Sequence, residues 1–157
     1  MTQVLETKKQ HRITLNRVAP EFFEAMMTIS AAAQKGIDPR LAELIKIRAS
    51  QLNHCAFCLD MHSHDARKNG ETEQRIYLLS AWEEAGDLYT EQEQAALALT
   101  EEMTDLTRGA HVSDAVYARA AAVFTDAELG QVIAMVTVIN AWNRISVSTR
   151  VAPPHRH

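Results

Sequence analysis

Apolar residues recur every three or four positions along most of the chain, whereas alternating apolar and polar residues are confined to short stretches. The first pattern is that of amphipathic α-helices, and the second is that of β-strands. The chain also has no internal repeat and no low-complexity tract. The pattern therefore predicts an all-α fold, a single-domain bundle of about six or seven helices.

Capping and turn residues indicate where the helices start and stop. Asp38 followed by Pro39 predicts a helix that reaches about Leu52. The next helix follows Asn53, a candidate cap, and is expected to end at the Asn69–Gly70 pair. Other helices are expected at about 21–34, 72–86, 90–103, 113–124 and 125–142.

The same pattern divides the chain into a domain with two short ends. Residues 1–18 are polar and poorly periodic, which indicates a loosely attached N-terminal arm. Residues 19–152 form the expected helical domain, and residues 153–157 a polar C-terminal tail. Within the domain, the helix at 125–142 is apolar on almost every side. A small monomer rarely covers every face of one helix, so we expect a homo-oligomer.

Composition and charge exclude several classes of partner. The chain has 157 residues, 16 Lys and Arg against 20 Asp and Glu, and a net charge of −4. Its basic residues are scattered, so we expect no binding to nucleic acid. No apolar run approaches the ~20 residues of a transmembrane helix, so we expect no membrane insertion. No export signal is evident, and the expected location is the cytoplasm.

The candidate chemistry lies on one helix face. Cys55 and Cys58 are three residues apart, and His62 follows four residues later, so the three side chains share a side. His62 can take the proton of Cys58 to give a thiolate. If Asn53 caps the helix, Cys55 lies in its first turn, where the helix dipole also favours a thiolate. The residues alone leave open which cysteine attacks first.

A bond between these two cysteines suits redox chemistry better than structural support. It would close a loop of about four residues, for which chain entropy gives only about 2 kcal/mol of stabilisation. Two other readings exist: inert core thiols, and a zinc site made of Cys55, Cys58, His62 and Glu43 in a zinc-binding or redox-sensing interaction protein. Structural zinc sites usually draw ligands from a tight knuckle and a distant second element, so we favour redox.

The stretch Glu43, eleven residues, Cys55-Ala-Phe-Cys58, three residues, His62 resembles the AhpD-like alkylhydroperoxidase branch of the carboxymuconolactone decarboxylase family. The resemblance is strongest over residues 40–82, and residues 140–145 look like the family's final helix. It implies an all-helical trimer or hexamer that reduces hydroperoxides with electrons from a thiol or dithiol donor. It also implies no metal, and no cofactor besides a redox-active disulfide between the two cysteines.

The resemblance also assigns roles to the four residues. Cys58 would attack the peroxide, Cys55 would resolve the sulfenic acid as a disulfide, and His62 and Glu43 would relay protons. One position departs from the best-known peroxidases, which carry a histidine beside the second cysteine where this chain has Phe57. This departure implies weaker peroxidase activity or a different substrate. The decarboxylase branch generally lacks the cysteine pair.

Overall fold

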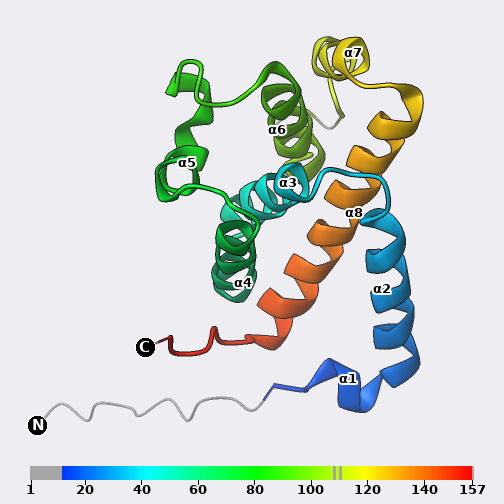
Figure 1. Ribbon diagram of the computed structural model, residues 1–157. Helices are drawn as coiled ribbons and strands as arrows, with labels where there is room; N and C mark the ends of the chain where they lie inside the picture. The colour runs from blue at the N-terminus through cyan, green and yellow to red at the C-terminus, as the bar shows by residue number, and fades with distance from the viewer. Residues whose placement is uncertain (1–11, 108, 110, 157) are drawn as a thin grey trace, which may run out of the picture.

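The protein is all-helical over residues 12–107, 109 and 111–156, which the computed structural model describes. Its elements are α1 Leu15–Val18, α2 Pro20–Ala33, α3 Pro39–Leu52, α4 Ala56–Lys68, α5 Glu73–Leu78, the 3₁₀ helix η1 Leu79–Glu84, α6 Glu91–Thr104, α7 Asp114–Val123 and α8 Asp126–Thr149 (Figure 1). The expected all-α class is confirmed, although these residues form eight α-helices rather than six or seven. Within this part of the chain, no helix is long and apolar enough to cross a membrane.

Helix α8 is the element around which the others are arranged. It runs between α2 on one side and α3, α4 and α6 on the other, and α3 packs on α4, α6 and α8 (Figure 1). Most apolar side chains of α8 are buried within the chain itself, among them Val132, Val136 and Ile139. Large exposed apolar side chains occur on several other helices, and those of α1 and α2 include Val18, Phe22 and Ile29.

The helix expected over residues 72–86 is shorter than predicted. Thr72 caps it as expected, because its hydroxyl accepts the backbone N–H of Arg75 at 3.2 Å. However, α5 ends at Leu78, and the chain continues as η1, in which Ala81 has non-helical angles. Leu79 and Trp82 are nevertheless buried, so this segment still contributes apolar side chains to the core.

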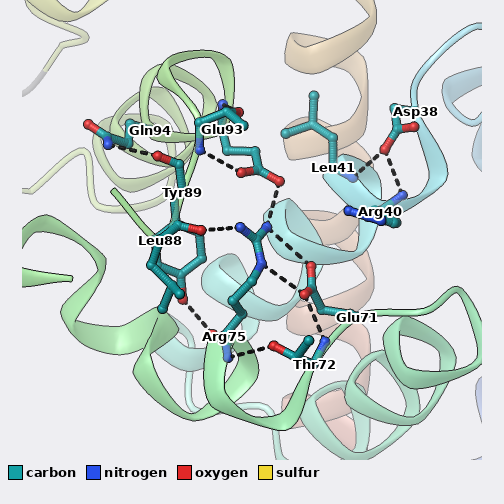
Figure 2. A network of polar contacts seen from close by, with 11 residues as sticks. Asp38, Arg40, Leu41, Glu71, Thr72, Arg75, Leu88, Tyr89, Glu93 and Gln94 are labelled. Carbon is teal, nitrogen blue, oxygen red and sulfur yellow. Dashed lines mark hydrogen bonds and ion pairs between the residues drawn. The ribbon is translucent and has the colours of Figure 1, made fainter. Parts of the chain in front are cut away.

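A network of ion pairs joins α5 to α6 around Arg75 (Figure 2). The guanidinium donates to Glu71 at 2.8 and 3.2 Å, to Glu93 at 2.6 Å and to the carbonyl of Leu88. Its charge also lies 4.7 Å from the ring centre of Tyr89, whose hydroxyl donates to the carbonyl of Arg75. Burial raises the pKa of Tyr89 to about 12, so this phenol stays protonated and keeps donating. The network fixes α5 against the N-terminus of α6.

Both ends of the chain contact the domain where they are described. Within the expected N-terminal arm, residues 15–18 form α1, and Arg12 donates to the carbonyl of Ser148 at 2.6 Å. In the expected C-terminal tail, Arg156 forms a two-pronged ion pair with Asp60 of α4, with its shortest contact at 2.7 Å. Residues 1–11 of the arm and residue 157 of the tail lie outside the described residues.

Candidate active site

The turn between α3 and α4 differs from the one expected. Asn53 ends α3 instead of capping α4, and His54 follows with a φ of 53° in the left-handed region. The backbone N–H groups of His54 and Cys55 donate to the carbonyls of Gln51 and Ser50 at 3.2 and 3.0 Å. This pair of bonds is the Schellman motif that ends many helices, usually with glycine in the place of His54. Three residues, Asn53, His54 and Cys55, thus connect α3 to α4.

Cys55 is itself the N-cap of α4. Its sulfur accepts the backbone N–H of Cys58 at 3.4 Å, so the two cysteines sit at the N-cap and third position of the helix. Both are free thiols and almost fully buried, at 2% and 1% exposure. The expected position of Cys55 within the first turn is therefore wrong. Helix α4 is capped two residues later than expected, because Asn53 and the left-handed His54 still belong to the end of α3.

Glu43 of α3 contacts His62 of α4, the residue with which the family resemblance pairs it. The carboxylate Oε2 lies 3.0 Å from the imidazole Nδ1, and both side chains are buried. The other oxygen, Oε1, accepts from the ammonium of Lys46 at 2.5 Å. Burial on its own would raise the pKa of Glu43, but the hydrogen bonds and charges of His62 and Lys46 outweigh it and hold that pKa below the usual 4.5. Glu43 is therefore a carboxylate at neutral pH.

Helix α8 supplies polar side chains that were not among the predicted site residues. Asn143 and Ser146 form hydrogen bonds with the thiol of Cys58. The amide of Asn143 also donates to the hydroxyl of Ser50 at 2.9 Å and accepts from Asn53 at 2.9 Å. A signal for them was present in the sequence, since Asn140 and Asn143 place two amides three residues apart in an otherwise apolar helix. Lys46 had no comparable signal, since one lysine on an amphipathic helix is ordinary.

The environment of Cys58 keeps its resting thiol protonated. Burial and the neighbouring Cys55 raise its pKa to about 11, although the hydrogen bonds of Asn143 and Ser146 act in the opposite direction. The sequence predicted an activated thiol at this position. Burial dominates in the folded chain, so Cys58 must lose its proton to a nearby base as it reacts.

A cavity of about 340 Å³ reaches Cys58 from the side of α2. Cys58, His62 and Lys46 line it, whereas Cys55 and Glu43 lie behind its wall. The remaining lining is mostly apolar and comes from α2, α4 and α8: Phe23, Met27, Ser30, Gln34, Phe57, Met61, Met135, Val138, Ile139, Trp142 and Ser146. Phe57, the residue that departs from the best-known peroxidases, thus forms part of the cavity wall. The arrangement offers a thiol, a base and an apolar binding space in one place.

Metal ligands do not converge in this site. Over residues 12–107, 109 and 111–156, no three His, Cys, Asp or Glu side chains are grouped so that they could hold a metal ion. Glu43 is occupied by His62 and Lys46, and the sulfur of Cys55 by the backbone of Cys58. The four residues considered for zinc are therefore arranged as hydrogen-bonding partners.

Comparison with known proteins finds relatives that cover most of the chain. The uncharacterized protein YdfG of Bacillus subtilis (strain 168) is 44% identical over 138 residues, which cover 87% of this chain and 92% of YdfG. A structure of a protein of unknown function from Agrobacterium tumefaciens, for which a role as antioxidant defence protein AhpD has been suggested, is 37% identical. It superposes with a TM-score of 0.88 over 94% of this chain and 100% of its own.

A more distant structure shares the fold alone. The debrominase Bmp8, solved in complex with 2,3,4-tribromopyrrole, is 18% identical, with a TM-score of 0.75 over 88% of this chain and 73% of its own. The model of the carboxymuconolactone decarboxylase family matches residues 20–102, which include α2, α3, α4 and all four predicted site residues. With more than half of its length matched and a relative 44% identical over most of both chains, this protein belongs to the carboxymuconolactone decarboxylase family.

Proposed function

We propose that this protein is a thiol-dependent peroxidase that reduces organic hydroperoxides with Cys58 and Cys55, in antioxidant defence. The observation that carries the proposal is the position of Cys58, which lines an apolar cavity together with His62 while Cys55 lies behind it. This arrangement favours Cys58 as the sulfur that meets the substrate. It agrees with the order that the family resemblance implies.

The first step transfers one oxygen atom to sulfur. His62 uses Nδ1 toward Glu43, so its Nε2 is the ring nitrogen that can accept the thiol proton, directly or through one water. The Cys58 thiolate attacks the terminal oxygen of ROOH, the O–O bond breaks, and Cys58 becomes a sulfenic acid. The proton held on His62 goes to the departing alkoxide, which leaves as ROH. The peroxide gains two electrons and the sulfur loses two.

The second and third steps return the enzyme to its reduced state. The thiol of Cys55 attacks the sulfenic sulfur of Cys58, forms a disulfide and releases water. Cys55 is one helical turn away, so this intramolecular step is expected to outrun further oxidation. A thiol or dithiol donor then reduces the disulfide by exchange and is itself oxidised.

The cavity favours a hydroperoxide with an apolar body. Apolar side chains dominate its wall, so burial of a hydrocarbon group there contributes about 25 cal/mol per Å² of apolar surface. Hydrogen peroxide gains nothing from that wall. We therefore expect cumene or tert-butyl hydroperoxide to react faster than hydrogen peroxide at equal concentration.

Trapping of the sulfenic acid tests the roles of the two cysteines. In Cys55→Ser, one equivalent of cumene hydroperoxide should give a sulfenic acid at Cys58 that a dimedone-type reagent captures. Cys58→Ser should give none, and the parent should lose both thiols and gain an internal disulfide. Capture at Cys55 in Cys58→Ser, at the rate of thiol loss in the parent, would show that the roles are reversed.

The alternative of a zinc-binding or redox-sensing protein is separated in the same preparation. Metal analysis and thiol titration before and after the hydroperoxide distinguish a stoichiometric zinc complex from a reactive dithiol. Repeated turnover with dithiothreitol as donor supports an enzyme, and a single oxidation without turnover supports a sensor. Parallel incubation with 2,3,4-tribromopyrrole asks whether the activity named for Bmp8 is shared.

A further inference from the structure

Lys46 carries a buried charge near Cys58, and none of the roles predicted so far involves it. Lys46 donates from its ammonium to Glu43 at 2.5 Å and to the amide oxygen of Gln34 at 3.3 Å. Only 13% of its side chain is exposed, compared with 8% for Glu43 and 10% for His62. A lysine ammonium seldom lies so deep without a specific partner. Its position on the cavity wall places this charge within the site.

The two oxygens of Glu43 have different partners, and this limits what the carboxylate can do. Oε2 faces Nδ1 of His62, and Oε1 is held by Lys46. A carboxyl group that relays protons must accept one during the reaction. Protonation of Glu43 would leave the ammonium of Lys46 buried beside a neutral acid, which is costly in a low-dielectric interior.

We propose that Lys46 is a positioning residue that keeps Glu43 a carboxylate throughout the reaction, so that the proton of Cys58 stops at His62. Glu43 then orients the imidazole and balances its charge but carries no proton itself. This inference rests on the proposed function for the identity of the reacting thiol. It replaces the two-residue proton relay that the family resemblance implies with a single base.

A charge count over the elements around Cys58 supports this assignment. Helix α3 contributes Glu43 and Lys46, and α4 contributes Cys55 and His62. The lining residues of α2 and α8 and the following Gln34 have only neutral side chains, and so has Asn143, which bonds to Cys58 from α8. When a proton moves from Cys58 to His62, the thiolate, imidazolium, carboxylate and ammonium sum to zero. Without Lys46 the same state would carry one uncompensated negative charge.

The test measures Cys58 reactivity without any peroxide. In the Cys55→Ser background, iodoacetamide alkylation of Cys58 is followed as a function of pH in the parent and in Lys46→Met. We expect Lys46→Met to react roughly tenfold more slowly near pH 6, as for a shift of one pKa unit. The difference should narrow as the pH rises and Glu43 is deprotonated without help. Infrared spectra of Lys46→Met should show a protonated carboxyl band that disappears when Glu43→Gln is added.

Two control variants separate this role from a merely structural one. Lys46→Arg should restore the parent profile because it keeps the charge, and Lys35→Met, at an exposed lysine, should leave the profile unchanged. Loss of stability in Lys46→Met with an unchanged pH profile and no new carboxyl band would overturn the proposal. A shifted alkylation profile without any peroxide turnover would instead refute the proposed function while supporting the role of Lys46.

Discussion

Two buried ion networks in this protein use similar groups for different ends. Around Arg75, one guanidinium is surrounded by two carboxylates, a carbonyl and an aromatic ring, and none of these groups lines the cavity (Figure 2). Around Glu43, the carboxylate is shared between His62 and Lys46, both of which line the cavity at Cys58. The Arg75 network has no access to the cavity and therefore serves to stabilise the fold. The Glu43 network reaches the cavity through His62 and Lys46, so it can exchange protons with a substrate there.

The largest effect on stability should follow from removing Arg75, the cation at the centre of the first network. Arg75→Ala leaves Glu71, only 5% exposed, without its cation, and loss of one partner of a buried pair costs about 3–5 kcal/mol. The free energy of unfolding in urea should fall by this amount, while Cys58 alkylation in the folded variant stays at the parent rate. Arg67→Ala removes an exposed pair with Glu73 and should cost less than about 1 kcal/mol. Equal losses in both variants would show that the Arg75 network contributes no more than a surface pair.

A change in the network around Glu43 should instead slow the reaction of Cys58 and leave the stability of the fold unchanged. His62→Ala removes the proposed base and should lower the rate of thiol oxidation by cumene hydroperoxide about 10²-fold at neutral pH. His64→Ala, at an exposed position of the same helix, is the matched control and should react at the parent rate. A folded His62→Ala protein that reacts as fast as the parent would remove His62 from the mechanism.

The pH dependence of stability should distinguish Glu43 from ordinary surface carboxylates. The contacts of Glu43 outweigh its burial and hold its pKa below the usual 4.5, so its contribution to stability is present above that value. The contribution is lost as the pH falls through the lower folded pKa. Between pH 7 and about pH 3, Glu43→Gln should therefore lose less free energy of unfolding than the parent does. Glu83→Gln, at an exposed site, should follow the parent, and parallel curves for all three proteins would contradict the assignment.

The smallest effect concerns the turns beside the two networks. Helices α3 and α4 both end in a Schellman motif, but the left-handed residue is His54 beside the site and Gly70 near Arg75. A side chain in the left-handed region costs about 1 kcal/mol relative to glycine. His54→Gly should therefore raise the free energy of unfolding by up to that amount, measured in urea. Unchanged or lower stability would mean that the imidazole makes compensating contacts.

The sequence was most informative where local rules decide the structure. Asp38 and Pro39 start α3 as predicted, and both capping boxes, at Thr90 and Thr125, open α6 and α8. The family resemblance had also grouped Glu43 with His62, and the short turn between α3 and α4 brings these two side chains into contact. Hydrogen bonds within a turn and periodicity within a helix suffice for such predictions.

Prediction failed where distant segments meet. The bonds of Asn143 and Ser146 to Cys58 depend on how α8 crosses α4, roughly ninety residues later in the chain, which no local pattern specifies. The raised pKa of Cys58 has the same origin, since burial is a property of the whole fold. The cap of α4 was misplaced for a different reason. Histidine is an unusual residue for a left-handed helix stop, so nothing at His54 indicated one.

The crossing of α8 over the cysteine helix also bears on the order in which the protein is made. Cys55 and Cys58 leave the ribosome well before Asn143 and Ser146, and at 5–20 residues per second the interval is about 5–20 s. During synthesis the two thiols therefore exist without the helix that buries them. We expect a nascent chain arrested before α8 to be alkylated at both cysteines more rapidly than the released protein. The two thiols are therefore buried only after α8 has been translated.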